Sequence, residues 1–202
     1  MIAATPFFSD RGCHIRIYSE IKYLLRNGYQ VKLCTYFLGT SPKDIKKNVI
    51  KTKQRNWYKK TTPGASWGKI ILNYDLLKIF IKEYKRFKPE IVHAHLYEGL
   101  LTAFLAKIFL LKNYKILFDC QGSLAAEIKA YSLNNKSSNK IIYRLVKIVE
   151  KILLFIPKYI ICSSENSKNF IGKEYKLKKE MLVLEDAVDE EVIIPGNKEL
   201  TK

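Results

Sequence analysis

The alternation of short apolar segments with amphipathic segments constrains the fold of this chain more than any other feature. Strand patterns of a few residues are separated by helical patterns, most of them ten or more residues long. Such an alternation favours a parallel sheet with helices packed on both faces. The sequence therefore predicts an α/β fold of three layers with a mostly parallel sheet.

The predicted elements follow one another without an internal repeat. We expect strands at 1–5, 30–36, 48–52, 90–94, 114–119, 158–162 and 181–184. We expect helices at 13–26, 67–87, 97–111, 123–131, 140–155 and 165–172. Ligands of parallel sheets bind beyond the carboxyl ends of the strands. This rule selects the loops at 6–14, 36–40, 94–99, 119–124 and 163–166.

The net charge of the chain is +17, which is high for 202 residues, and 30 of its 36 basic residues are lysine. The length suits one sizeable domain, and an apolar content of 48% argues against disorder. The charge has three readings: a lysine-rich coding bias, attraction to anionic lipid headgroups, or nucleic acid binding. Nucleic acid is the least favoured, because base reading relies on arginine, which is scarce here.

The four cysteines form no Cys-x-x-Cys pair, and most fall at strand ends, where small buried thiols pack well. They are Cys13, Cys34, Cys120 and Cys162. This usage suits a reducing compartment. Asp10 and Arg11 interrupt the apolar start, so no secretory signal is expected. The most apolar helix, at 99–111, contains Lys107 and falls short of the roughly 20 residues that span a bilayer. We expect a cytoplasmic protein.

The loop at 6–14 carries Gly12 at the start of a predicted helix. The amino end of a helix presents unpaired N–H groups and a partial positive charge, and a glycine lets a phosphate approach the backbone. Arg11, His14 and Arg16 add positive charge beside this glycine. An ordinary turn glycine is the competing interpretation.

His93 and His95 alternate along a predicted strand, so they point to the same face of the sheet. A zinc site would need a third ligand, and His14 is the one further histidine in the chain. We therefore predict no metal. The favoured interpretation is that His93 is packed and that His95 emerges at the strand end as a polar contact or proton-transfer group.

Two further strand ends carry polar groups on the same predicted edge as His95. The first is the loop Asp119-Cys120-Gln121-Gly122-Ser123, in which Ser123 can cap the next helix. The second is Ser163-Ser164, which can cap the helix that begins at Glu165. Capping and ligand binding are both open for these serines.

These motifs, in this order, resemble the amino-terminal domain of the family 4 retaining glycosyltransferases, which have two Rossmann-like domains in the GT-B fold. The resemblance rests on the glycine loop, the His-x-His strand end, the Gln-Gly-Ser loop, the Ser-Ser strand end and a closing turn. That turn usually reads Asn-Gly-Val-Asp, whereas this chain has Asp186-Ala187-Val188-Asp189. The resemblance implies a Rossmann-like domain that is one half of a GT-B architecture.

The resemblance also implies roles for individual residues. The donor diphosphate would be bound by Arg11, Gly12 and Cys13. The transferred sugar would be contacted by His95, the expected catalytic residue. The acceptor would be bound by His14, Gln121, Gly122, Ser123 and Ser164. The family requires neither a metal nor another cofactor.

By the same resemblance, residues 1–189 form the amino-terminal, acceptor-side domain, and 190–202 begin an interdomain linker. The family's first strand normally starts a few residues before Met1. Its second domain, which holds the nucleotide sugar, is missing, so the chain alone is expected to be inactive. The expected reaction moves a hexose from a nucleotide-diphosphate sugar to a lipid- or saccharide-linked acceptor, in glycan biosynthesis at the cytoplasmic membrane face.

Three alternatives stay open. The chain can be the acceptor-binding subunit of a split glycosyltransferase, a non-catalytic basic module that binds membrane or nucleic acid, or the remnant of a broken reading frame. The predicted helix Lys140–Phe155 bears on the membrane question, because its basic residues at 140, 144, 147 and 151 share one face. This helix either lies on an anionic leaflet of the membrane or packs on the domain with a solvated basic edge.

Overall fold

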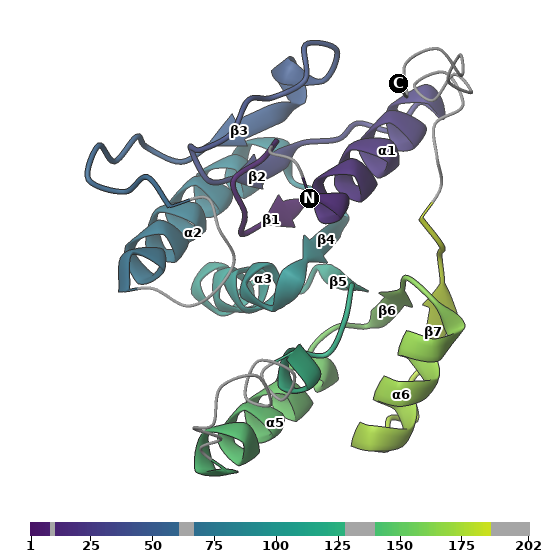
Figure 1. Ribbon diagram of the computed structural model, residues 1–202. Helices are drawn as coiled ribbons and strands as arrows, with labels where there is room; N and C mark the ends of the chain where they lie inside the picture. Colours follow the sequence, from purple (N-terminus) through teal and green to yellow (C-terminus); the bar gives the residue numbers. More distant parts are fainter. Residues whose placement is uncertain (9–10, 61–66, 128–139, 187–202) are drawn as a thin grey trace, which may run out of the picture.

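The computed structural model describes residues 1–8, 11–60, 67–127 and 140–186 (Figure 1). Seven strands form one sheet in the order β3-β2-β1-β4-β5-β6-β7, and every neighbouring pair is parallel. The strands are β1 (Ile2–Ala3), β2 (Leu33–Thr35), β3 (Val49–Lys51), β4 (Ile91–His95), β5 (Lys115–Cys120), β6 (Tyr159–Cys162) and β7 (Met181–Val183). The strand order reverses between β1 and β4, which is the switch point where such sheets bind ligands.

The helices of the described residues connect these strands as the sequence predicts. They are α1 (Gly12–Arg26), α2 (Trp67–Phe87), α3 (Leu96–Leu110), α5 (Lys140–Phe155) and α6 (Glu165–Tyr175), with a short 3-10 turn, η1 (Lys46–Asn48). The predicted α/β alternation is confirmed, and α2 and α5 begin and end at the predicted residues. Of the helix predicted at 123–131, residues 124–127 are helical and the rest lies outside the described residues. The predicted boundary at 189 and the linker at 190–202 also lie outside them.

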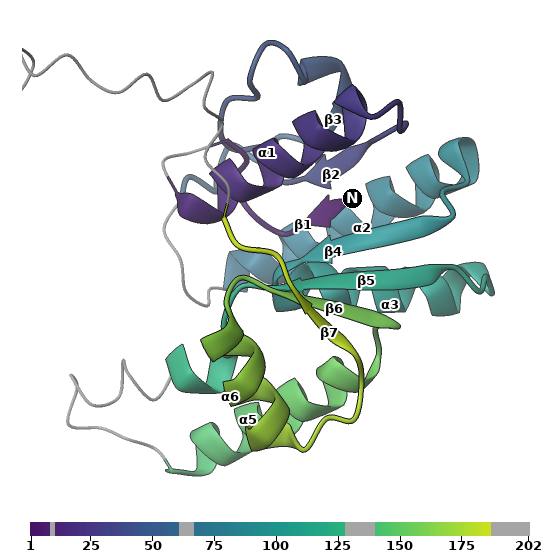
Figure 2. The same ribbon diagram turned by 90° about the vertical axis from the view of Figure 1, so that its right-hand side faces the viewer.

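The two faces of the sheet are covered unequally. Helix α1 lies on one face, where Ile17 and Ile21 pack against Ala3 and Leu33. Helices α2, α3, α5 and α6 lie on the other face (Figure 1, Figure 2), over a larger core that includes Phe118. Burying each such aliphatic side chain stabilises the fold by about 1.5–3 kcal/mol. The described residues thus form three layers, in which a single helix, α1, covers one face of the sheet.

The period of strand β4 determines which side chains face α1. Val92 and Ala94 point into the core under α2 and α3, and both are buried. His93 and His95 therefore point to the opposite face, beneath α1. In the parallel register His95 lies beside Asp119 of β5. The strand pattern thus brings two histidines and a carboxylate under one helix.

The loops after β1 and β2 pack against each other at the carboxyl edge of the sheet. Gly39 has a φ of +82°, and a Cβ at this position would lie 2.6 Å from the carbonyl carbon of Phe7. The backbone N–H of Thr40 donates to the carbonyl oxygen of Phe8 over 3.0 Å. A glycine is required here for both its conformation and the close approach.

Helix α5 leaves much of its apolar surface exposed. It buries Leu153, Leu154 and Glu150 against the domain. Five of its exposed apolar residues follow a spacing of four and three residues: Ile141, Leu145, Ile148, Ile152 and Phe155, and Val149 is exposed beside them. None of the helices within the described ranges is long and apolar enough to cross a membrane.

Candidate functional site

A buried ion pair joins α1 to the end of β5. The guanidinium of Arg16 donates from Nε to Oδ2 of Asp119 and from Nη2 to Oδ1, both over 2.9 Å. Burial acts to raise the pKa of Asp119, but hydrogen bonds from His95 and Arg16 hold it well below its usual range. Nη1 of Arg16 also donates to the carbonyl oxygen of Leu184 and to Oδ1 of Asp186, each over 2.7 Å. Arg16 therefore connects α1 to the chain after β7. Its positive charge, which the sequence suggested would act beside Gly12, is instead compensated by Asp119 and Asp186.

Both histidines of β4 lie beside this pair. Nδ1 of His95 is 3.1 Å from Oδ2 of Asp119, and the rings of His93 and His95 are 4.2 Å apart between centroids. Oε2 of Glu20, one turn after Arg16 on α1, is 3.7 Å from Nδ1 of His93 and 3.7 Å from Nε2 of His95. We call Arg16, Glu20, His93, His95 and Asp119 the α1-face cluster.

Burial determines the protonation of the α1-face cluster. It lowers the pKa of His93 and of His95, so both imidazoles are neutral near pH 7. Burial, together with the charge of Asp119, raises the pKa of Glu20 to about 8. The cluster therefore holds one firmly ionised carboxylate and one carboxyl group that its surroundings keep from ionising.

The α1-face cluster also contains most of the unpaired polar atoms of the described part of the chain. Five buried side-chain N or O atoms there have no hydrogen-bond partner, and four belong to this cluster: both carboxylate oxygens of Glu20, Nε2 of His93 and Nε2 of His95. A buried polar atom without a partner costs about 1–3 kcal/mol. A folded domain tolerates such a concentration of unpaired atoms most readily where function requires it.

The amino end of α1 is open to solvent. Arg11 occupies the N-cap position in an extended conformation, with φ −144° and ψ 140°. Gly12 is exposed, and a Cβ built on it would meet no atom within 4 Å. Cys13 is half-buried, and burial raises the pKa of its thiol. A helix amino end with open space at Gly12 suits an anion, because the first N–H groups of a helix have no partner within the helix.

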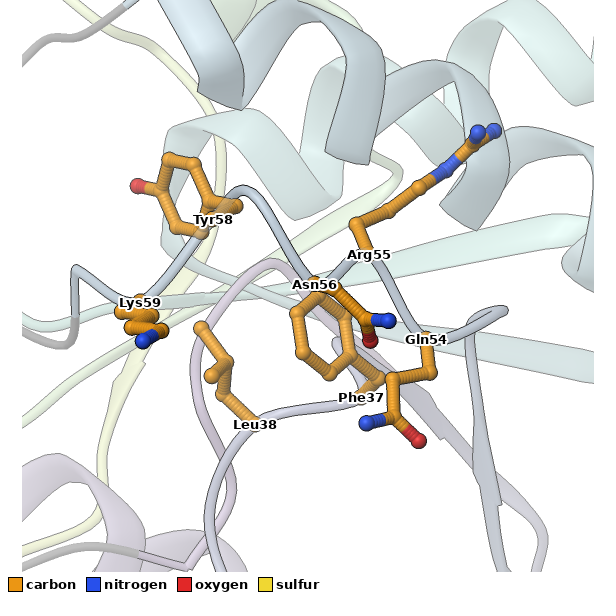
Figure 3. Close-up of a pocket in the computed structure, with 7 residues that line it drawn as sticks. All are labelled: Phe37, Leu38, Gln54, Arg55, Asn56, Tyr58 and Lys59. Carbon is orange, nitrogen blue, oxygen red and sulfur yellow. The ribbon is translucent and has the colours of Figure 1, made fainter.

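A cavity of about 400 Å³ opens beyond the carboxyl ends of β2 and β3 (Figure 3). Its walls are Phe37, Leu38, Gln54, Arg55, Asn56, Tyr58 and Lys59. In Figure 3 Phe37 and Asn56 lie close together, whereas Arg55 extends away from the cavity. Arg55 is bound there by Asp75 through two hydrogen bonds of 2.8 and 2.9 Å. Apart from Arg55, the lining is therefore aromatic, aliphatic and amide in character, with one basic residue, Lys59.

A sequence model of Glycosyltransferase Family 4 matches residues 11–192. The chain belongs to Glycosyltransferase Family 4. A search of curated protein sequences found no match.

Solved structures show the same fold. Sucrose-phosphate synthase from Thermosynechococcus elongatus has a TM-score of 0.69 at 12% identity, over 96% of this chain and 49% of that one. A glycosyltransferase from Rickettsia africae ESF-5 has a TM-score of 0.53 at 18% identity, over 96% of this chain and 46% of that one. The chain thus spans about half the length of these two proteins. The predicted Rossmann-like half of a GT-B architecture is confirmed.

In this family 4 domain, His14 lies inside the protein. Its ring is fully buried, with Nε2 2.7 Å from Oγ1 of Thr5 and the ring edge against Phe7 at 5.9 Å between centroids. His14 therefore packs against the inner side of the loop after β1. Its predicted contact with an acceptor stays a prediction, and in this conformation the ring does not reach solvent.

The predicted serines cap helices of the family 4 domain. Oγ of Ser123 accepts from the N–H of Ala126 over 3.2 Å, and Oγ of Ser164 accepts from the N–H of Ser167 over 3.1 Å. The capping interpretation is confirmed for both. Nε2 of Gln121 donates to Oδ2 of Asp119 over 2.8 Å, so Gln121 adjoins the α1-face cluster. The carbonyl oxygen of Gly122 accepts from the thiol of Cys120.

Glu150 of α5 holds the connection after β5 from the other face of the sheet, and it lies outside every motif described above. Its carboxylate is fully buried. Its five donors are the hydroxyls of Tyr97, Tyr175 and Ser123 and the backbone N–H groups of Leu124 and Ala125. One signal was available in the sequence, because Glu150 is the single acidic residue of Lys140–Phe155. No comparable signal marks Glu20 or the residues that line the cavity.

Proposed function

We propose that this chain is the acceptor-side domain of a retaining glycosyltransferase, which moves a sugar from a nucleotide-diphosphate sugar to a lipid- or saccharide-linked acceptor in glycan biosynthesis. The observation that carries the proposal is the family match over 11–192, on a sheet whose switch point adjoins the open amino end of α1. Glycosyl transfer needs stabilisation of a departing diphosphate and of positive charge on the sugar. The donor itself is bound mainly by a second domain that residues 1–202 do not include.

The donor diphosphate lies, in this proposal, at the start of α1. The N–H groups of Gly12 and Cys13 point outward from a helix amino end, where the helix dipole favours negative charge. The guanidinium of Arg11, at the N-cap position, adds a full positive charge. Arg16 contributes through the position of α1 and not as a phosphate ligand, since its guanidinium is engaged by carboxylates.

His95 is the proposed catalytic residue. Asp119 accepts a hydrogen bond from Nδ1, which directs the unprotonated Nε2 to the other side of the ring. Nε2 has no hydrogen-bond partner, so it is available as an acceptor for a sugar hydroxyl or a proton. The full burial of His95 means that α1 or the loop after β1 has to move before a sugar reaches it.

The acceptor, in this proposal, enters along the same edge and uses the cavity beyond β2 and β3. Sugar rings present apolar C–H faces that suit Phe37 and Tyr58, and hydroxyls that suit the amides of Gln54 and Asn56. Of the predicted acceptor residues, Gln121, Gly122 and Ser164 are partly exposed at the carboxyl edge, whereas His14 and Ser123 are buried behind it. The cavity supplements these residues with a lining that can stack on a saccharide.

Helix α5 is the proposed contact with the inner face of the cell membrane. Its exposed apolar stripe from Ile141 to Phe155 is flanked by Arg144 and Lys151, which are both exposed. Each basic residue close to an anionic leaflet gains roughly 1 kcal/mol. Lys147 is held by Glu174 of α6, so it is the wrong residue for a charge test, because its loss also breaks this pair.

The membrane proposal is tested with liposomes of anionic and neutral lipid. The wild-type chain should sediment with anionic vesicles at low salt and detach at high salt. Arg144→Glu with Lys151→Glu should abolish this sedimentation, whereas the matched change Lys173→Glu on α6 should not. Equal sedimentation with neutral vesicles, or none with either, contradicts the proposal.

Transfer of labelled sugar tests the main proposal. Residues 1–202 alone, with UDP- and GDP-sugars, should give no turnover, whereas the same residues joined to or mixed with a donor-binding domain should glycosylate a lipid or saccharide acceptor with retained anomeric configuration. Robust turnover by residues 1–202 alone would overturn the assignment of donor binding to a second domain. Donor hydrolysis with an inverted product would overturn the retaining mechanism.

A further inference from the structure

Beyond glycosyl transfer, we infer that Glu20, His93 and His95 form a binding site for one divalent transition metal ion, of the class that includes Zn²⁺. The site lies between α1 and β4, on the α1 face of the sheet. It needs no nucleotide sugar and no second domain. Because the ion would occupy Nε2 of His95, metal binding and the proposed contact of this nitrogen with a sugar exclude each other.

The three ligand groups already converge. Oε2 of Glu20 is 3.7 Å from Nδ1 of His93 and 3.7 Å from Nε2 of His95, and the ligand atoms of the three residues lie within 4.8 Å of one another. Ligands of a tetrahedral zinc ion, at about 2.0–2.1 Å from the metal, are about 3.4 Å apart. The two distances to Glu20 therefore differ from those of a bound ion by a few tenths of an ångström. The remaining distance, between the two imidazole nitrogens, is at most 4.8 Å, so the rings have to turn toward each other to share one ion.

A second layer of contacts holds these ligands in place. Asp119 accepts from Nδ1 of His95, so the lone pair of Nε2 faces Glu20. A carboxylate that orients a metal-binding imidazole in this way is a regular feature of zinc sites. Nε of Arg16 lies 3.3 Å from Oε1 of Glu20 and also binds Asp119. With a doubly charged ion and Arg16, the three carboxylates Glu20, Asp119 and Asp186 bring the net charge of the assembly to zero.

The donor set selects the class of metal. Two imidazoles with one carboxylate suit Zn²⁺ and related transition metals, whereas Mg²⁺ and Ca²⁺ require oxygen ligands. The ligand atoms are buried and include the unpaired atoms of His95 and Glu20, so a bound ion would satisfy groups that the protein leaves unpartnered. His93 also lines a cavity of about 610 Å³ at the amino ends of β2 and β4, which gives the ion a path of entry.

Metal titration of the chelator-treated chain tests the inference. Calorimetry with Zn²⁺ should show one ion per chain, and the melting temperature should rise with Zn²⁺ concentration, because the ion binds the folded state. Bound Co²⁺ should give the visible absorption of a four-coordinate nitrogen and oxygen site. It should lack the thiolate charge-transfer band, since Cys34 packs in the core under α2 and α3, on the other face.

Two variants identify the ligands. Glu20→Gln keeps the shape of the side chain and should weaken Zn²⁺ binding at least tenfold, while the melting temperature of the metal-free protein stays the same or rises. His93→Gln should weaken binding similarly and provides a second test if one variant folds poorly. Glu165→Gln, an exposed glutamate of α6, should bind Zn²⁺ as the wild type does. The inference is wrong if the wild type binds no Zn²⁺, if both ligand variants retain full affinity, or if cobalt shows thiolate absorption.

Discussion

Two glutamates on opposite faces of the same sheet differ in their surroundings. Glu150, on α5, is fully buried and accepts hydrogen bonds from five donors of its own chain. Glu20, on α1, is almost as buried, with 12% of its side chain exposed, and neither oxygen has a hydrogen-bond partner. A buried carboxylate that accepts hydrogen bonds from several parts of the fold stabilises their arrangement. A carboxylate that makes no hydrogen bond, and only a 3.3 Å ion-pair contact with Nε of Arg16, has room for a ligand.

The donors of Glu150 explain what it ties together. Tyr97 comes from α3, Ser123 and the N–H groups after it from the connection following β5, and Tyr175 from α6. The two N–H groups belong to the amino end of a helical segment, which favours a negative charge. Glu150 therefore fixes the loop that carries Gln121 and Gly122, from the face opposite to the α1-face cluster.

The largest expected effect is on catalysis and concerns His95, which lies next to Glu20 in the α1-face cluster. In a form of the protein that contains the donor-binding domain, His95→Ala should lower the transfer rate about 10²–10⁴-fold, the usual range for a proton-transfer or positioning group. The variant should still fold, with a melting temperature lowered by the loss of a buried side chain and of its hydrogen bond to Asp119. A collapse of the melting temperature with an unchanged rate per folded molecule would show that His95 is a core residue.

Glu150→Ala should give the largest loss of stability. The substitution removes the acceptor of five hydrogen bonds, three of them buried, so we expect the free energy of unfolding to fall by about 3–5 kcal/mol, as when a buried charge network loses one partner. Urea denaturation followed by circular dichroism measures it. Glu150→Gln keeps the shape and part of the acceptor capacity, and should lose less. A loss below about 1 kcal/mol for the alanine variant would show that Glu150 does not stabilise the fold more than Glu20 does.

Asp119→Asn should destabilise the domain by about 3 kcal/mol, the lower end for breaking a buried ion pair. The loss is limited because Arg16 keeps its contact with Asp186. Rescue by the double variant Arg16→Met with Asp119→Asn would show that the unpaired arginine carries the penalty. If the double variant is less stable than Asp119→Asn alone, the unpaired charge of Arg16 does not cause the loss of stability.

Glu20→Gln should have the smallest effect in the chelator-treated protein, within about 0.5 kcal/mol of the wild type or slightly stabilising. No hydrogen bond is lost, and Arg16, which loses its 3.3 Å contact with Oε1 of Glu20, keeps its bonds to Asp119. The same denaturation experiment measures it, with Glu165→Gln as control. A loss as large as that of Glu150→Ala would mean that the two glutamates play the same structural role.

The sequence by itself determined the architecture and several local features. The alternation of strand and helix patterns predicted the parallel sheet, because each period matches one kind of buried surface. Two-residue periodicity placed His93 and His95 on one face. Hydroxyl side chains before helical patterns predicted the caps at Ser123 and Ser164, since a cap needs only the helix that follows it.

Only the tertiary structure determined which of these local features meet. Arg16 and Glu20 share a helix face by their spacing, but the sequence does not state which strand lies under that face. Asp119 is 103 residues from Arg16, and Glu150 is 53 from Tyr97. Local sequence patterns predict which segments are helices or strands and which of their faces are apolar. Contacts between distant residues depend on how whole helices and strands pack together. Whether the carboxylate oxygens of Glu20 and Glu150 find hydrogen-bond donors therefore depends on how α1 and α5 pack on the two faces of the sheet.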